Sequence, residues 1–67
     1  MPQDNTVQSV ERAFKILEEL ATEKEGLGVT ELASRIGLHK STVHRMLTTL
    51  LSLGYVEQNT SSEKYRL

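Results

Sequence analysis

The order of hydrophobic and polar positions predicts a long amphipathic helix near the start of the chain. Apolar side chains recur at helical spacing from near Ser9 until Gly26 and Gly28 interrupt the pattern. On a wheel of about 100° per residue centred on Phe14, one face gathers apolar residues, namely Val7, Val10, Leu17 and Ala21. The other side is charged: Glu11, Arg12, Lys15, Glu18 and Glu19. We therefore expect the face around Phe14 to pack on the core.

The apolar arc of this helix is wider than a single small core requires. Ala13, Ile16 and Leu20 extend it to about half of the circumference. We assign Ile16 and Leu20 to a second contact surface, outside the intrachain core, through which two copies of the domain pair.

A shorter helix is predicted over the sequence TELASRIG. Thr30 is a favourable N-cap, and Gly37 is a favourable stop. Three apolar residues share one face of this segment, namely Leu32, Ala33 and Ile36. Before it, Val29 is expected to form a very short strand.

The third predicted helix begins after Leu38 and His39, runs to Leu53 and ends at Gly54. Its buried stripe is predicted to contain Val43, Met46, Leu47, Leu50 and Leu53. Its outer face is polar and basic, and consists of Ser41, Thr42, His44, Arg45, Thr48, Thr49 and Ser52.

After Gly54 the pattern changes to two short strands, 55–57 and 64–67, around a turn with the sequence NTSSE. This pattern predicts a β-hairpin over 55–67. Tyr55 and Tyr65 are expected to pack in the hairpin and core rather than to stack on bases. Residues 1–6 are polar and aperiodic and are predicted to form a flexible arm, so that one domain covers 7–67.

The spacing of three residues within 29–48 is typical of a helix-turn-helix. Ala33 is small where two helices cross closely, Gly37 lies where a tight turn favours positive φ, and Val43 packs the second helix back on the first. A hairpin directly after this motif predicts a winged helix-turn-helix. The fold class is thus mainly α with a small β-hairpin, namely three helices plus a two- or three-stranded wing.

Length and composition narrow the class of protein. Sixty-seven residues suffice for one small domain. The absence of cysteine excludes disulfides and cysteine-ligated zinc. No apolar run approaches the roughly 20 residues of a membrane span, and the first residues do not resemble a signal peptide, so we expect a cytoplasmic protein without a membrane partner.

Charge is distributed unevenly, although the net charge is only −1. Residues 1–31 contain seven acidic and three basic side chains, whereas residues 32–56 contain three basic side chains and no acidic one. The basic stretch coincides with the helix-turn-helix. A local positive field of this kind favours contact with the phosphates of double-stranded DNA.

The predicted DNA contacts follow from position on the third helix. The start of such a helix enters the major groove, where the Arg45 guanidinium is suited to gripping a guanine. Lys40 is expected to meet phosphate, and His39 to act as a helix cap or a phosphate donor. In the wing we expect backbone or minor-groove contacts. The full predicted set is Thr30, His39, Lys40, Ser41, Thr42, His44, Arg45, Thr48, Thr49, Asn59, Ser61, Ser62 and Lys64.

Two other classes of function remain open. A winged helix that binds another protein would suit the acidic overall charge. An enzyme is disfavoured because so short a chain offers no evident pocket with paired titratable groups, and Ser41 with His44 lacks a third group to orient the histidine. His39 and His44 are five residues apart without a nearby cysteine, so no metal site is predicted. We expect no catalytic residues and no cofactor.

Three stretches of the chain resemble the amino-terminal domain of the isocitrate-lyase-regulator (IclR) family: VQSVERAFKILEEL, GVTELASRIGLHKSTVHRMLTTLLSLGYVEQ and EKYRL. The resemblance implies a metabolite-responsive bacterial transcriptional regulator, with repression as its expected mode. It further implies a homodimer or dimer of dimers that binds a DNA operator. In this family a linker helix and an effector-binding domain follow, so Leu67 would lie where the linker begins and the small-molecule effector would bind outside this chain.

Overall fold

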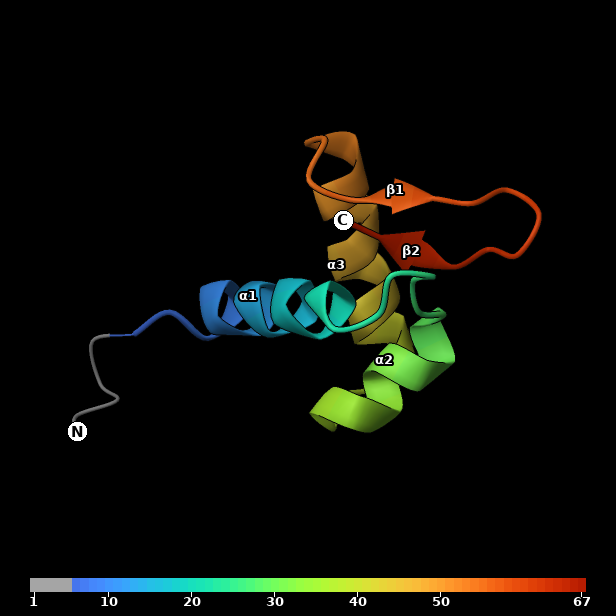
Figure 1. Cartoon of the computed structure of the whole chain (residues 1–67). Helices are drawn as coiled ribbons and strands as arrows, with labels where there is room; N and C mark the ends of the chain where they lie inside the picture. The colour runs from blue at the N-terminus through green and yellow to red at the C-terminus, as the bar shows by residue number, and fades with distance from the viewer. Residues whose placement is uncertain (1–5) are drawn as a thin grey trace.

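The computed structural model describes residues 6–67, which form three helices followed by a two-stranded antiparallel sheet. The helices are α1 (Gln8–Ala21), α2 (Val29–Ile36) and α3 (Lys40–Ser52). The strands are β1 (Glu57–Gln58) and β2 (Tyr65–Arg66). Figure 1 shows α1 lying across α3, with α2 beside the start of α3 and the hairpin extending to one side. The predicted fold class is confirmed, whereas most of the predicted arm, residues 1–5, lies outside the described residues.

One hydrophobic core joins the three helices and the hairpin. Its fully buried side chains come from each of the three helices: Ile16 and Leu20, Leu32, and Val43 and Leu47. Leu27, Val56 and Tyr65 close the core from the loop and the hairpin. Each such apolar side chain stabilises the fold by roughly 1.5–3 kcal/mol when it is removed from water.

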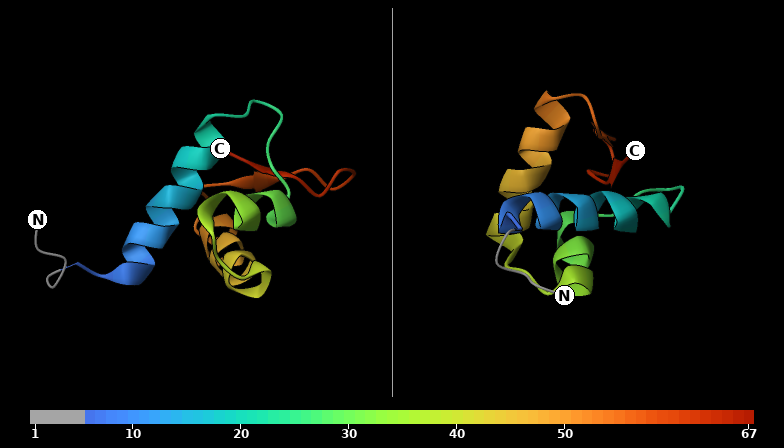
Figure 2. Two further views of the ribbon diagram at one scale, coloured as in Figure 1. Left: turned by 90° about the horizontal axis from the view of Figure 1, so that it is seen from below. Right: turned by 90° about the vertical axis from the view of Figure 1, so that its left-hand side faces the viewer.

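The face of α1 that packs on the core is not the face predicted from the sequence. Ile16 and Leu20 are buried, whereas Val7, Val10 and Phe14 are exposed, with 59% of Phe14 open to solvent. The physical reason lies in the tertiary arrangement: α2 and β2 contact α1, and Figures 1 and 2 show the first half of α1 projecting beyond the other elements. The assignment of Ile16 and Leu20 to a second surface is therefore wrong.

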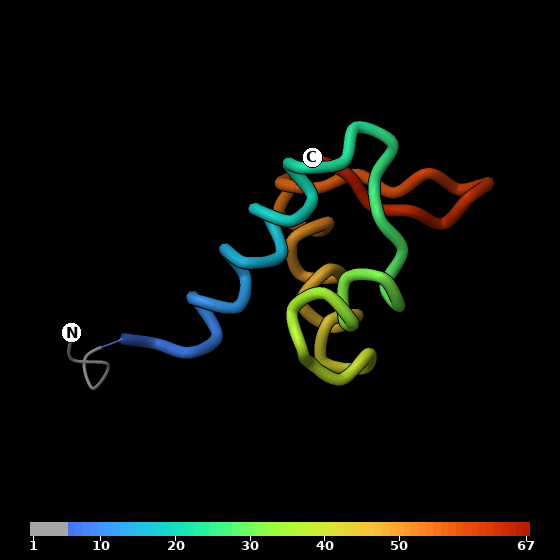
Figure 3. Tube along the Cα trace, turned by 60° about the horizontal axis from the view of Figure 1, so that its bottom comes forward, coloured from blue at the N-terminus to red at the C-terminus, as the bar shows by residue number. Residues whose placement is uncertain are grey.

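The turn between α2 and α3 follows the predicted spacing. Gly37 adopts φ 71°, ψ 35°, a left-handed conformation that lacks a steric penalty only in glycine. The amide groups of Gly37 and Leu38 both donate to the carbonyl oxygen of Ala33 and so close the end of α2. Val43 is fully buried against this pair of helices. The tube in Figure 3 shows α2 and α3 stacked beside one another around this turn.

The start of α2 differs from the sequence-based expectation in two ways. The helix begins at Val29, so Val29 is not a strand, and the N-cap is Gly28 rather than Thr30. The carboxylate of Glu31 accepts a hydrogen bond from the Gly28 amide at 3.2 Å, which is one half of a capping box. Gly28 has no side chain to supply the other half. Thr30 is an exposed residue of the first turn.

The end of α3 also corrects a prediction. The helix ends at Ser52, and Gly54 with φ 87° turns the chain away, so Leu53 does not reach the core and is 64% exposed. Val56 is buried instead. Tyr65 packs in the core as predicted, whereas Tyr55 is exposed.

The hairpin is paired with the loop that precedes α2. Glu57 lies opposite Arg66 and Gln58 opposite Tyr65, while Leu27 forms a bridge with Tyr65 through hydrogen bonds of 2.9 and 2.8 Å. A Cβ atom at Gly26 would lie 2.5 Å from the Tyr65 carbonyl oxygen. Glycine is therefore required for this close approach, which ties the wing to the loop after α1.

Candidate DNA-binding surface

The outer face of α3 carries most of the predicted site residues. Lys40, Ser41, His44, Arg45, Thr48 and Thr49 are exposed, and Thr42 is half-buried. The burial of Val43 and Leu47 holds this face outward because residues three and four apart lie on the same side of a helix. No acidic side chain belongs to α3, whose sequence is KSTVHRMLTTLLS. The helix thus presents hydroxyl groups and cations without a competing carboxylate of its own.

The structure brings five predicted residues together in one open cleft. Thr42, His44, Arg45, Thr48 and Thr49 line a cleft of about 580 Å³. Its other walls are Met46 of the same helix and two residues of α1, Ser9 and Arg12. Helical periodicity places Arg12 on the charged side of the first helix and predicts no DNA contact for it. The sequence distance between Arg12 and the third helix does not indicate that they are neighbours, because only the crossing of α1 and α3 brings Arg12 beside α3.

Two threonines on this face are hydrogen-bonded to their own helix. The hydroxyl of Thr48 donates to the His44 carbonyl oxygen at 2.9 Å, and that of Thr49 donates to the Arg45 carbonyl oxygen at 3.1 Å. This back-bonding satisfies the hydroxyl groups within the helix while leaving their oxygen lone pairs exposed. Neither hydroxyl proton is directed outward, so these residues fit a close-approach surface better than a set of donors.

The N-cap and the first two residues of α3 do not line the cleft. His39 occupies the N-cap position, but its side chain makes no capping hydrogen bond. Only the backbone of His39 takes part in the helix: its carbonyl oxygen accepts a hydrogen bond from the Val43 amide at 3.1 Å. His39 as a side-chain cap is therefore wrong, while its role as a phosphate donor stays a prediction. Lys40 and Ser41 follow in the first, exposed turn, where a helix N-terminus attracts anions.

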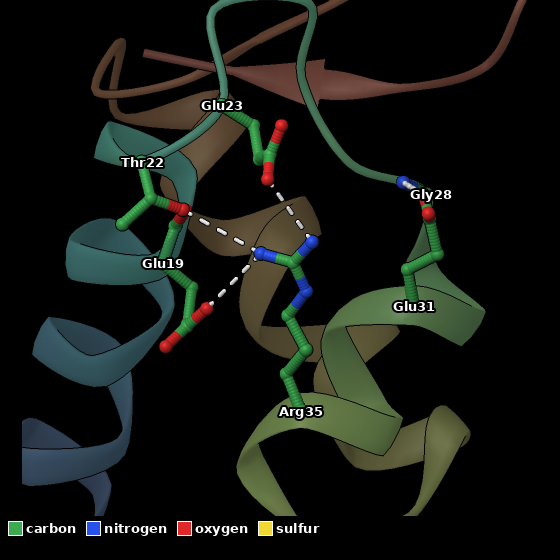
Figure 4. Close-up of polar contacts among 6 residues, drawn as sticks. All are labelled: Glu19, Thr22, Glu23, Gly28, Glu31 and Arg35. Carbon is green, nitrogen blue, oxygen red and sulfur yellow. Dashed lines mark hydrogen bonds and ion pairs between the residues drawn. The ribbon is translucent and has the colours of Figure 1, made fainter.

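One cation of the basic stretch is neutralised within the fold. Arg35 of α2 forms two ion pairs, at 3.3 Å from Glu19 in the last turns of α1 and at 3.1 Å from Glu23 in the loop after α1. Figure 4 shows the guanidinium group reaching between them and Thr22. Hydrogen bonds to Glu23 and then Glu19 raise the pKa of Arg35 above its ordinary value. Arg35 therefore ties α2 to the end of α1 and the loop after it, and does not contribute a free charge to the predicted DNA-binding surface.

The tip of the wing is organised by its own asparagine. The Asn59 side-chain oxygen accepts from the amides of Ser61 and Ser62 at 2.8 and 2.9 Å. Glu63 takes φ 66° to complete the turn, and the Lys64 amide donates to the Ser62 hydroxyl. Asn59 thus shapes the turn, and its oxygen is not available as a free acceptor. None of the wing residues lines the cleft beside α3.

Lys64 provides a test of the wing as a contact to the DNA backbone. Lys64→Ala is expected to weaken binding to all duplex sequences alike, because a single ammonium group on phosphate reads no base. The slope of log affinity against log salt should become shallower by about one unit. Fluorescence anisotropy at several salt concentrations measures both quantities. Lys24→Ala removes an exposed lysine in the loop after α1 and serves as the matched control.

Comparison with known proteins assigns the chain to a family. A family model described as the IclR helix-turn-helix domain matches residues 9–60. The chain belongs to the IclR helix-turn-helix family. The family match spans α1 from its second residue, α2, α3, β1 and the first two residues of the turn between the strands.

Relatives within the IclR family are regulators by name. The chain is 51% identical over 65 residues to the HTH-type transcriptional regulator KdgR of Dickeya chrysanthemi, covering 97% of this chain and 21% of that protein. It is 44% identical over 57 residues to the transcriptional repressor IclR of Escherichia coli, covering 85% of this chain and 21% of that protein. The chain thus spans about a fifth of the length of these relatives. Their names are those of transcriptional regulators and not of enzymes.

A solved structure agrees with the IclR assignment. The crystal structure of an IclR family transcriptional regulator from Brucella abortus superposes with a TM-score of 0.86 at 36% identity, covering 97% of this chain and 25% of that one. Within residues 6–67, no helix is long and apolar enough to cross a membrane. The same residues contain no group of three or more histidine, cysteine or acidic side chains placed to hold a metal ion.

Proposed function

We propose that this chain binds double-stranded DNA in a sequence-specific manner, as the DNA-binding domain of a bacterial transcriptional repressor that responds to a metabolite. The observation that carries the proposal is the outward face of α3, where Lys40 and Arg45 stand among small hydroxyl side chains without a carboxylate on the same helix. A face of this kind fits the major groove, which admits an α-helix. The repressor and regulator names of the relatives support this reading.

A selection experiment tests the proposal. The wild-type chain is used to recover duplexes from a randomised DNA library, and the affinity for a recovered duplex is compared with that for a scrambled duplex at two salt concentrations. We expect preference for the recovered duplex by at least about a thousandfold in a full regulator, and a smaller preference for one isolated domain. Both affinities should fall steeply with salt. Equal affinity for the two duplexes, or salt-independent binding, would contradict DNA recognition.

The exposed apolar face of α1 supports an assembly of two copies on DNA. Val7, Val10 and Phe14 are spaced three and four residues apart and are all more than half exposed. These three residues take the place of Ile16 and Leu20 as the predicted pairing surface, because Ile16 and Leu20 are buried in the core. We propose that it packs against the same face of a second copy, so that two α3 helices meet successive turns of a palindromic operator. A protein partner on this face is the alternative that the next experiment distinguishes.

Phe14→Glu is expected to abolish cooperative binding to a duplex with two half-sites, because a carboxylate at the centre of an apolar interface is poorly solvated. Affinity for a single half-site should not change. Titration of both duplexes by anisotropy measures the two quantities. Leu53→Glu, which introduces the same charge at another exposed apolar residue, is the matched control. If the wild-type chain binds the two half-sites independently, the second copy is not the occupant of this face.

The remaining features of the proposal concern the longer regulator. Since the relatives are about five times as long as this chain, we propose that a small-molecule effector acts through a separate carboxyl-terminal domain. In that protein the operator-bound species is a dimer or dimer of dimers, and its place of action is the bacterial cytoplasm, where its DNA lies.

A further inference from the structure

One wall of the cleft beside α3 is formed by α1, which has no predicted contact with bases. Ser9 and Arg12 are one turn apart on α1, and they face Thr42, Arg45 and Thr49 across the opening. The first half of α1 projects past the body of the domain on this side (Figures 1 and 2). A ligand that fills the cleft would therefore contact both helices at once.

The charge of this cleft is entirely positive. Its lining contains two guanidinium groups, those of Arg12 and Arg45, and no carboxylate. Arg12 is half-buried, and among residues 6–67 its guanidinium makes no ion pair, in contrast to Arg35 and Arg66. An arginine that is held in a cleft without an anionic partner is matched to an external anion with several acceptor oxygens.

The backbone of α1 reinforces this preference. Val7 is the N-cap residue and provides no side-chain hydrogen bond to the first amides of the helix. The Val10 amide donates to the Val7 carbonyl oxygen at 3.1 Å, whereas the Gln8 and Ser9 amides have no hydrogen-bond partner among residues 6–67. The positive end of the helix dipole lies among these amides. Glu11 is the one acidic residue of the first turn, and it does not line the cleft.

We infer that this cleft binds one backbone phosphate of the duplex, with Arg12 as its principal ligand and the Ser9 hydroxyl as a second donor. The inference rests on the proposed DNA binding and adds α1 as a second point of attachment. A phosphate held between α1 and α3 fixes the position of α3 in the major groove. Because every nucleotide carries the same phosphate, this contact contributes to affinity and leaves base preference unchanged.

The experiment compares wild type with Arg12→Ala and Lys15→Ala on the recovered and the scrambled duplexes. Lys15 is an exposed cation on the same helix that does not line the cleft, so it controls for the loss of one charge. Arg12→Ala should bind both duplexes roughly tenfold more weakly at 0.1 M salt, as expected for one charge-assisted contact. Its salt slope should be shallower by about 0.9, while Lys15→Ala stays close to wild type.

Neutral methylphosphonate linkages, introduced one at a time along each strand of the recovered duplex, locate the contact. At one position per half-site, the neutral linkage should weaken wild type but should not weaken Arg12→Ala further, because the partner is already absent. At the other contacted positions both proteins should lose affinity equally. Circular dichroism verifies the fold, and Arg12→Gln, which retains the length of the side chain, replaces Arg12→Ala if that variant unfolds.

The outcomes separate this inference from the function on which it rests. A wild-type chain without preference for the recovered duplex would overturn the proposed DNA recognition itself. Specific wild-type binding with an unchanged affinity and salt slope in Arg12→Ala would overturn the phosphate contact alone. The same holds if every methylphosphonate weakens wild type and Arg12→Ala by equal factors. Loss at a single base pair instead of a phosphate would make Arg12 a base reader and would also contradict the inference.

Discussion

Arg45→Ala is expected to cost about 1–3 kcal/mol of binding free energy on the recovered duplex and to relax preference at one base pair per half-site. Arg45 lies two residues after the fully buried Val43 and is itself exposed, so its side chain projects from the side of α3 opposite the core. The planar fork of the guanidinium matches the O6 and N7 acceptors of guanine. Arg45→Lys should recover only part of the loss, because an ammonium group lacks that fork.

The measurement is a binding profile across all single-base variants of the recovered duplex, for wild type and Arg45→Ala. Arg12→Ala is the comparison, because the loss of a phosphate contact lowers the affinity for every duplex by the same factor. If the Arg45→Ala profile runs parallel to the wild-type profile, Arg45 is a phosphate ligand like Arg12. A flattened preference at one position identifies it as the base reader.

Ile16→Ala is expected to destabilise the domain by about 2–5 kcal/mol, since it removes buried methyl groups and leaves a cavity among fully buried neighbours. Ile16 is completely inaccessible to solvent and belongs to the same core cluster as Leu20, Leu32 and Leu47. In a domain of this size such a loss lowers the midpoint of thermal unfolding by at least about 8 °C. Small domains are stable by only a few kcal/mol, so the variant is expected to be partly unfolded at 37 °C.

Phe14→Ala is the matched control, because it removes a larger apolar side chain from the other face of the same helix. We expect its free energy of unfolding to stay within about 0.5 kcal/mol of wild type at low micromolar concentration. Thermal unfolding followed by circular dichroism compares the two variants directly. Equal destabilisation by both changes would restore the sequence-based assignment, in which the face around Phe14 packs on the core.

The elements of this fold were predictable from local sequence because their signals are local. Helical spacing of apolar residues, the stop at Gly37 and the polar turn between two short strands each act over a few residues. The spacing of Ala33, Gly37 and Val43 was also sufficient for the helix-turn-helix, since it reflects a turn that only certain residues permit. The polar face of α3 followed from the same periodicity.

Local signals failed at the ends of elements. Thr30 is a good N-cap by residue type, but α2 begins two residues earlier than a Thr30 cap predicts, and the Gly28 amide donates a hydrogen bond to the Glu31 carboxylate. Leu53 fits the periodicity of α3, yet Gly54 redirects the chain before it reaches the core. At such boundaries two local options differ by little energy, and packing decides between them.

The choice of face on α1 and the partners of the arginines were decided by the tertiary structure alone. The sequence determined that α1 is amphipathic over a broad arc, but both halves of that arc are apolar, so hydrophobicity could not select Ile16 and Leu20 over Val10 and Phe14. In the same way, the sequence did not reveal that Arg35 is paired with acidic residues, or that Arg12 lies beside α3. The crossing of α1 with the other two helices places two glutamates against Arg35 and places Arg12 beside α3, because long-range contacts, unlike helical periodicity, depend on how the elements pack together.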